Sequence, residues 1–212
     1  LPAGWRGTVA DVTDEAGMKA LFAEVSEAWG GLDVLCANAG IAGPTALVED
    51  VALEDWRSCV SVNLEGVFLA AKFAAPMMQA AGRGSLVVPS APAGQFGSPT
   101  RARDAAARWA VIGLTKTLAM ELGPHGIRAN AICPGAVEGP RMEGVLEREA
   151  AAKGMTRDEV YAGYASGTSM KSFVAASDIA NMAVFLGSGA ARLVSGQVIA
   201  VDGHTVNPDP KV

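Results

Sequence analysis

Short apolar runs alternate with longer segments of helical periodicity along the whole chain, and this alternation limits the possible folds more than any other feature. Strand-like runs lie at residues 8–10, 32–37, 85–88, 127–132 and 197–203. Helical patterns fill 15–29, 53–62 with a continuation through 66–81, about 104–122, and 177–186. No internal repeat or linker interrupts the series. The pattern predicts one α/β domain over residues 1–212, with a parallel, doubly wound sheet.

Turn and cap residues mark the limits of these elements. The run Thr13-Asp14-Glu15 offers a cap for the first helix, and Gly30 and Gly31 end it. Pro76 would kink its helix or end it early. The segment 89–103 is predicted to be an irregular loop, and the polar, weakly periodic segment 137–173 is predicted to form one or two surface helices over the domain as a lid.

Composition excludes several functional classes. The formal net charge is −5 and the basic residues are scattered, so a nucleic acid or an anionic membrane surface is not an expected partner. The longest candidate for a membrane span, 67–78, contains Lys72 and is too short. Cys36, Cys59 and Cys133 are far apart in apolar surroundings, which predicts buried free thiols, no metal site and a cytoplasmic location.

Several short motifs occur in an order and spacing that resemble one known family. The anchors are Asp11-Val12, Asn38-Ala39-Gly40, Asn63, the run 109–116, the run 130–135, Gly196-Gln197 and the run 201–203. Together they are similar to the short-chain dehydrogenases/reductases along essentially the whole chain. The resemblance implies a Rossmann-type fold, NAD or NADP as cofactor, and an alcohol or ketone substrate.

The resemblance assigns cofactor contacts to three segments, and each has a structural alternative. Asp11 and Val12 match the pair beside the adenine, or they are an acidic strand end beside a helix cap. Asn38, Ala39 and Gly40 match the segment against the adenosine ribose, although the same motif also stabilises the central strand. Pro134, Gly135 and Val137 match the segment that holds the nicotinamide carboxamide, or they form a strand-ending turn.

The catalytic positions that the family implies are largely substituted. In the family a serine precedes a tyrosine by thirteen residues, a lysine follows that tyrosine by four, and a helical asparagine completes the set. Alignment on the run 109–116 places Ala91, Asp104 and Arg108 at the serine, tyrosine and lysine positions. Asn63 stands at the asparagine position, as a proton-relay residue or as a satisfied polar residue inside a helix. Ser90 is a doubtful substitute for the serine because neighbouring strand residues point in different directions.

Asp104 and Arg108 have two interpretations. Their spacing of four residues near a helix start favours a structural ion pair, worth about 0.2–0.5 kcal/mol on an exposed helix. The alternative is a new acid/base device, in which Asp104 acts as general base and Arg108 binds an anion. We prefer the interpretation that Asp104 and Arg108 form a structural ion pair.

The start of the chain also departs from the family pattern. The family's glycine-rich phosphate loop belongs to a strand-helix unit before Asp11, and only ten residues precede Asp11 in this sequence. We expect that the polypeptide extends beyond Leu1; the alternatives are a rearranged sheet or one completed by another chain. Without the loop, binding of NAD or NADP is in doubt.

Three functions therefore remain open. The first is a non-catalytic or very weakly active relative, the second an ordinary NAD(P)-dependent oxidoreductase, and the third a lyase or isomerase that uses Asp104 and Arg108. The lid segment 137–173 resembles a substrate lid, which would admit a small-molecule ligand, although surface helices packed on the core are an equal alternative. The helices at 53–81 and 104–122 and the run 196–203 resemble assembly surfaces, which implies a homodimer or homotetramer.

Overall fold

The sheet has four parallel strands. The computed structural model describes residues 3–207, and at positions 148, 149 and 152 it describes the backbone alone. Neighbouring strands follow chain order, β1-β2-β3-β4, and every pair is parallel. The strands are β1 (Val34–Cys36), β2 (Gly84–Pro89), β3 (Ile127–Pro134) and β4 (Val198–Val201). The predicted α/β class with a parallel sheet is confirmed.

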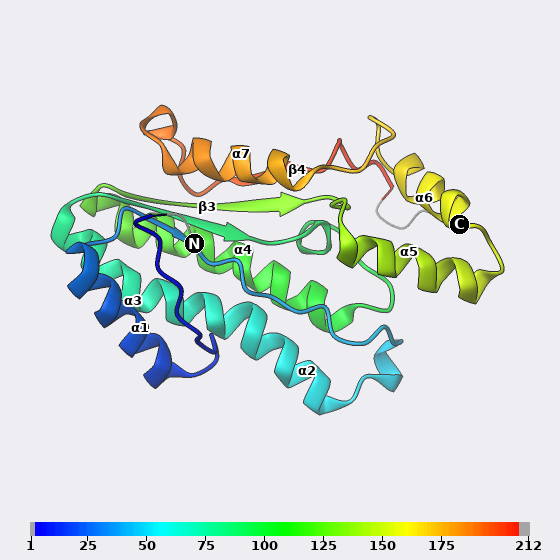
Figure 1. Ribbon diagram of the computed structural model, residues 1–212, viewed down its shortest axis with the longest axis horizontal. Coiled ribbons are helices and arrows are strands. Elements are labelled where there is room, and N and C mark those ends of the chain that lie inside the picture. Colours follow the sequence, from blue (N-terminus) through cyan, green and yellow to red (C-terminus); the bar gives the residue numbers. More distant parts are fainter. Residues whose placement is uncertain (1–2, 208–212) are drawn as a thin grey trace.

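Helices cover both faces of the sheet (Figure 1). On one face lie α1 (Glu15–Trp29), α3 (Gly66–Ala81) and α4 (Ala102–Leu122), and α7 (Ala176–Gly187) lies on the other. The remaining helices are α2 (Leu53–Val60), α5 (Pro140–Lys153) and α6 (Arg157–Ser166). Short helical turns occur at η1 (Val48–Asp50), η3 (Pro92–Gly94), η4 (Gly123–His125) and η5 (Gly189–Ala191). This layering is the doubly wound arrangement that the alternation predicts.

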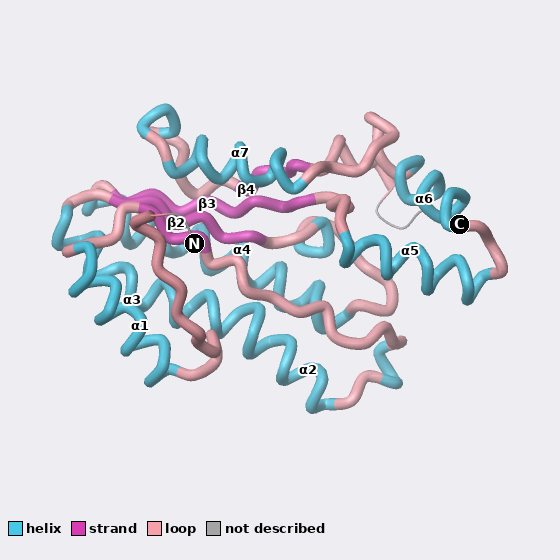
Figure 2. Tube along the Cα trace, viewed as in Figure 1, coloured by secondary structure: helices cyan, strands magenta, loops and turns pink. Residues whose placement is uncertain are grey.

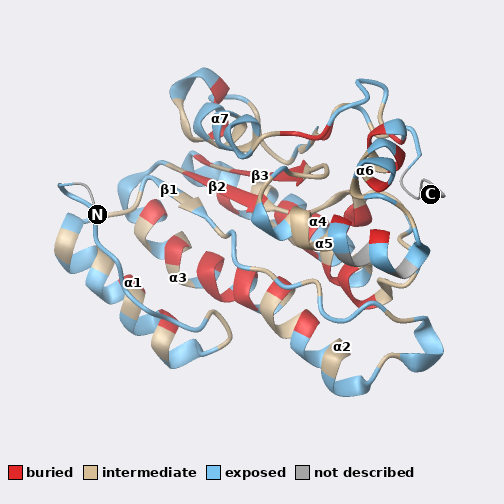
Figure 3. Ribbon diagram, turned by 45° about the vertical axis from the view of Figure 1, so that its right-hand side comes forward, coloured by how far each residue is buried: buried red, intermediate tan, exposed pale blue. Residues whose placement is uncertain are grey.

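The central strands β2 and β3 form the middle of the core (Figure 3). Leu86, Val87 and Val88 on β2 are buried, as are Ile127 and Ile132 on β3. Strands of a parallel sheet are covered on both faces, so they consist of nearly continuous apolar residues. The largest core cluster lies between these strands and the helices α1 and α3, which cover one face of the sheet.

The expected strand at residues 8–10 does not form. Figure 2 shows the chain before α1 as loop, and Val9 is fully exposed. A strand forms only where a neighbour accepts and donates its backbone hydrogen bonds, and within residues 3–207 β1 pairs with β2 alone. β1 is thus the edge strand of the described sheet. Cys59 and Cys133 are buried as expected, but the expectation of a third buried thiol is wrong, because Cys36 on this edge strand is exposed.

One continuous helical segment runs from Leu53 to Ala81. A π-helical turn, η2 (Ser61–Glu65), joins α2 to α3, and Pro76 lies inside α3 without ending it. The segment has 29 residues, and an 18-residue window within it has a mean hydropathy of 1.3, so its length and composition alone would suffice to cross a membrane, unlike the shorter run considered in the sequence. Its apolar face packs in the core, which accounts for that composition without a membrane.

The predicted lid contains two helices, α5 and α6, which lie beside each other at one end of the sheet (Figure 1). They have their own small apolar cluster, built around Leu146 and Val160. A short bridge between Val137 and Val174 joins the two ends of the segment. The lid is therefore anchored at its base to the ends of β3 and α7.

Candidate active site

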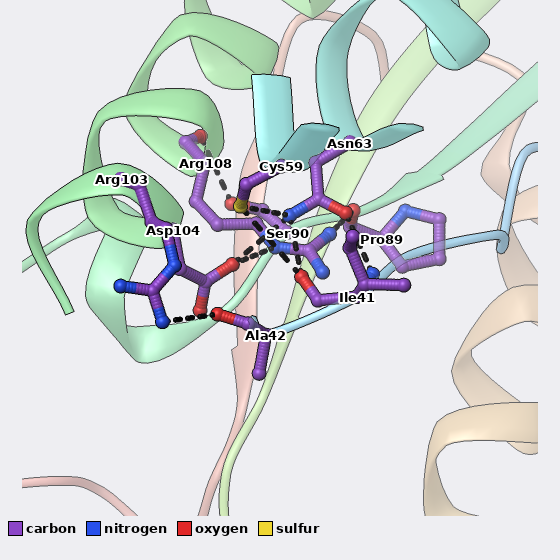
Figure 4. Close-up of polar contacts among 9 residues, drawn as sticks. All are labelled: Ile41, Ala42, Cys59, Asn63, Pro89, Ser90, Arg103, Asp104 and Arg108. Atoms are coloured by element: carbon purple, nitrogen blue, oxygen red, sulfur yellow. Dashed lines mark hydrogen bonds and ion pairs between the residues drawn. The ribbon is translucent and has the colours of Figure 1, made fainter. Parts of the chain in front are cut away.

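Asn63 lies at the centre of a buried polar cluster, in the π-helical turn between α2 and α3 (Figure 4). Its Oδ1 accepts a hydrogen bond from Ile41 N at 2.8 Å, and its Nδ2 donates to Ile41 O at 2.8 Å. The same Nδ2 lies 3.3 Å from Cys59 Sγ and 3.1 Å from Asp104 Oδ1. The wider turn of a π-helix displaces one residue from the regular ladder, and here it directs the amide towards the loop after β1.

Asp104 and Arg108 form an ion pair in the first turns of α4. Arg108 Nε lies 3.2 Å from Asp104 Oδ1, and the two side chains are 14% and 11% exposed. Arg108 Nη1 also donates to Pro89 O at 3.2 Å. Two nitrogens of the guanidinium therefore have partners: Nε contacts Asp104 on α4, and Nη1 contacts Pro89 at the end of β2. The ion pair expected from the spacing is present, and it is much more buried than a surface helix pair.

The end of β2 supplies a serine whose hydroxyl faces α4. Ser90 is 5% exposed, and its Oγ donates to Arg108 O at 3.1 Å. Ala91 caps the short turn η3 with extended backbone angles and has no polar side-chain atom. Ser90 thus points at the backbone of α4 instead of standing in the position that the resemblance gives to a catalytic serine.

Cys59 lies inside the same cluster. Burial raises the pKa of its thiol, the carboxylate of Asp104 adds to this, and the positive charges of Arg103 and Arg108 oppose it. Burial also raises the pKa of Cys133, although a hydrogen bond with Ser90 opposes the shift. Both thiols are therefore stabilised in the neutral form.

The segment expected to face the adenosine ribose follows β1. Asn38 and Ala39 are exposed, and Gly40 approaches Arg108 so closely that a Cβ on Gly40 would lie 2.7 Å from Arg108 Nη2. The same Cβ would lie 3.2 Å from Asn63 Oδ1. Gly40 is thus packed against the Asn63 and Arg108 side chains, which joins this segment to the polar cluster.

Asp11 and Val12 lie in the loop before α1. Asp11 Oδ1 accepts hydrogen bonds from Thr13 N at 2.9 Å and Thr13 Oγ1 at 2.8 Å, which lower the pKa of this exposed carboxyl. Val12 packs against Gly66 at the start of α3 and borders the main core cluster. The N-terminus of α1 is capped by the Asp14 carboxylate, which accepts from Ala16 N.

Pro134, Gly135 and Val137 leave the end of β3 towards the lid. Gly135 N donates to Val201 O at 2.9 Å, and a Cβ on Gly135 would lie 2.8 Å from Asp202 Cα. Val137 makes the bridge to Val174. The turn is thus fixed to the end of β4, at the carboxyl edge of the parallel strands, where ligands of open α/β sheets bind.

Comparison with known proteins identifies the family. The family model described as enoyl-(acyl carrier protein) reductase matches residues 3–204. The chain belongs to the short-chain dehydrogenase/reductase family. It is 38% identical over 193 residues to trans-4-hydroxycyclohexanecarboxylate dehydrogenase of Sinomonas cyclohexanicum. The aligned residues make up 91% of this chain and 68% of that protein.

Two further relatives are informative. A protein of Xanthobacter autotrophicus named inactive 2-(S)-hydroxypropyl-CoM dehydrogenase 2 is 40% identical over 201 residues, 95% of this chain and 84% of that protein. The structure of NAD⁺-bound xylitol dehydrogenase has a TM-score of 0.87 and 27% identity, over 92% of this chain and 77% of that one. The fold and the oxidoreductase family are therefore shown, and a solved member binds NAD⁺.

Three of the four positions that the short-chain dehydrogenase/reductase resemblance assigns to catalysis come together in this chain. Asn63, Asp104 and Arg108 are joined by hydrogen bonds, whereas Ala91 contributes no polar atom. The cofactor positions Gly40 and Pro134 border the same end of the sheet, and Asp11 lies in the loop before α1. Among the described side chains, which leave out positions 148, 149 and 152, no group of three or more potential metal ligands occurs.

Sequence reasoning did not single out Arg103. This arginine, in the first turn of α4, is completely buried, and its Nη2 donates to Ala42 O at 3.2 Å (Figure 4). The expected helix start near Asp104 left Arg103 in the preceding loop, where a charged side chain is usually solvated. Cys59 was recognised only as a buried thiol, although its place four residues before Asn63 puts the two side chains on one helical face.

Proposed function

We propose that this short-chain dehydrogenase/reductase chain has a disabled dehydrogenase site, and that it is non-catalytic or very weakly active as an oxidoreductase. The observation that carries the proposal is the closed hydrogen-bonded cluster of Asn63, Asp104 and Arg108, in which a carboxylate occupies the position of the family's tyrosine. The proton donor that hydride transfer to a ketone requires is missing from that position.

The chemistry of the substituted side chains supports this proposal. A phenol passes a proton to the developing alkoxide, whereas an aspartate ordinarily carries no proton near neutral pH. Arg108 is engaged by Asp104 and by Pro89 O, so its guanidinium is held away from the role of a free lysine. Ser90 directs its hydroxyl proton to Arg108 O, and Ala91 has no hydroxyl group. The name of the Xanthobacter relative, which includes the word inactive, is consistent with the loss of activity in a similar sequence.

The described residues fit part of a dinucleotide. Asp11 and the Asn38–Gly40 segment offer contacts of the kind that a nucleoside needs, and either NAD or NADP is the cofactor class of the family. The family's pyrophosphate contacts lie in a strand-helix unit before Asp11, so the cap of α1 by Asp14 does not bear on them. We assign no reaction step to the dinucleotide.

Turnover of NADH and NADPH with a panel of ketones, and of NAD⁺ and NADP⁺ with the matching alcohols, tests the proposal. We expect rates equal to those of a control without protein. A measurable rate that Ser90→Ala abolishes would instead support an ordinary oxidoreductase that works through Ser90. A rate in the absence of any dinucleotide that Asp104→Asn abolishes would support the lyase or isomerase alternative.

We also propose that the chain is a cytoplasmic homodimer or homotetramer. Exposed apolar side chains on α3 and α4 support the self-association: Phe68 is 47% exposed, Trp109 53% and Met120 80%. Light scattering at micromolar concentration is expected to give at least twice the monomer mass, and Trp109→Asp should lower it. A monomeric mass for the unchanged protein would contradict the proposal.

A further inference from the structure

Arg103 has a buried charge without a full set of hydrogen-bond partners. The side chain is 0% exposed, and one N–H bond, from Nη2 to Ala42 O, is satisfied. Within the described residues, Nε and Nη1 are buried and have no partner. These two nitrogens carry three N–H groups, all of them donors. Buried charges in proteins are normally paired, so this arginine requires an explanation.

The neighbouring carboxylate does not neutralise Arg103. Asp104 Oδ1 accepts from both Arg108 Nε and Asn63 Nδ2, which forms the ion pair of the cluster. Two guanidinium groups and one carboxylate therefore leave one positive charge. The cap residue of α4, Arg101, makes no side-chain cap bond. The partial positive charge at the N-terminus of this 21-residue helix therefore adds to the positive electrostatic potential around Arg103.

The loop at Ala42 and Gly43 packs against the guanidinium. A Cβ added to Gly43 would overlap Arg103 Nε, so the guanidinium lies directly against the backbone of this glycine, which has a φ of +66°. The loop is tied to the segment before α4 by the hydrogen bond from Ala46 N to Thr100 O, 3.1 Å long, and Thr100 itself has a positive φ of 62°.

We propose that Arg103, supported by Arg108, forms a binding site for the carboxylate of a small organic acid, beneath the loop at Ala42 and Gly43. One carboxylate balances the one uncompensated positive charge, and it accepts from Arg103 Nε on the edge of the guanidinium that Gly43 covers; the N–H groups of Nη1 face the opposite side. A phosphate dianion would leave an additional negative charge beside Asp104. The proposal does not depend on the loss of hydride transfer, since it concerns binding alone.

Binding of benzoate, compared with benzamide, tests this site. The two molecules have nearly the same shape, but benzamide has no charge. By titration calorimetry, we expect the unchanged protein to bind benzoate about tenfold or more tightly than benzamide. Arg103→Gln should abolish that difference. Arg192→Gln, which removes the same charge from an exposed position just after η5, should preserve it.

A second measurement uses the unchanged protein and therefore holds even if Arg103→Gln does not fold. Acetate is expected to displace benzoate, whereas acetamide and inorganic phosphate at equal ionic strength are not. Equal affinity for benzoate and benzamide, a preference for benzoate that survives in Arg103→Gln, or displacement by phosphate as effective as that by acetate would overturn the carboxylate site. Turnover of NAD(P)H is measured separately and bears only on the proposed function.

Discussion

Asn63 and Asp104 are 41 residues apart in the sequence, yet Asn63 Nδ2 lies 3.1 Å from Asp104 Oδ1 in the buried interior. Arg108 Nε lies 3.2 Å from the same oxygen. A single carboxylate oxygen thus links the π-helical turn of one helix to the first two turns of another. The cluster thereby holds the two helices together.

This linkage makes Asp104 a residue with a measurable effect on stability. Asp104→Ala would leave the guanidinium of Arg108 largely buried without its carboxylate, and we expect a loss of about 3 kcal/mol in the free energy of unfolding by urea titration. The double variant Asp104→Ala/Arg108→Ala should recover part of that loss because no unpaired charge remains at this pair. Additive losses in the two single variants would contradict the coupling.

Asn63 satisfies both backbone groups of Ile41, so its removal leaves a partly buried donor and a partly buried acceptor without partners. Asn63→Ala is expected to lower the free energy of unfolding by roughly 2–4 kcal/mol. The matched control is Asn181→Ala, at an exposed position on α7, which should change it by less than about 0.5 kcal/mol. Equal effects of the two substitutions would show that the amide of Asn63 has no structural role.

Gly135 permits a close approach of β3 to β4. A Cβ there would lie 2.8 Å from Asp202 Cα, so Gly135→Ala must displace the backbone and should destabilise the protein by about 1–3 kcal/mol. Gly113, on the exposed side of α4, has no atom within 4 Å of the corresponding position. Gly113→Ala should stabilise the protein by roughly 0.5–1 kcal/mol. Thermal denaturation should show a lower melting temperature for Gly135→Ala and a higher one for Gly113→Ala. A shift in the same direction for both would mean that the steric contact at Gly135 is not the cause.

The buried thiols predict a loss of stability in alkali. Because burial raises the pKa of Cys59 and Cys133 in the folded state, their contribution is complete below the ordinary thiol pKa of about 8.5 and is lost as the pH rises through the folded values. The urea midpoint should therefore fall between pH 8 and pH 10. The fall should be smaller in Cys59→Ala/Cys133→Ala, since the other titrating groups remain. An identical fall in both proteins would contradict this assignment.

Alkylation at pH 8 provides a control for the same thiols. Cys36 is exposed, although partial burial raises the pKa of its thiol, so it should react with iodoacetamide more slowly than a fully solvated thiol, while Cys59 and Cys133 remain unmodified in the folded protein. Mass spectrometry should show one adduct, and Cys36→Ala should show none. Rapid reaction of all three cysteines would mean that the native interior opens much more readily than its burial indicates.

The sequence was informative wherever a single element carried the signal. The continuous apolar runs predicted β2 and β3, and the cap in the run Thr13-Asp14-Glu15 predicted the start of α1, because periodicity and capping are local properties. The spacing of Asp104 and Arg108 likewise predicted their ion pair. The strand expected at residues 8–10 and the buried state of Cys36 were wrong, since both depend on whether a neighbouring strand is present.

The arrangement of the site was decided by tertiary structure. The sequence by itself determined the parallel α/β class, the family resemblance and the substitution of serine, tyrosine and lysine by Ala91, Asp104 and Arg108. Only the folded chain showed that Arg103 is buried and that Ser90 faces a helix backbone. The physical reason is that burial and hydrogen bonding arise between segments distant in sequence, where the order of residues along one element carries no information about the neighbour that will cover it.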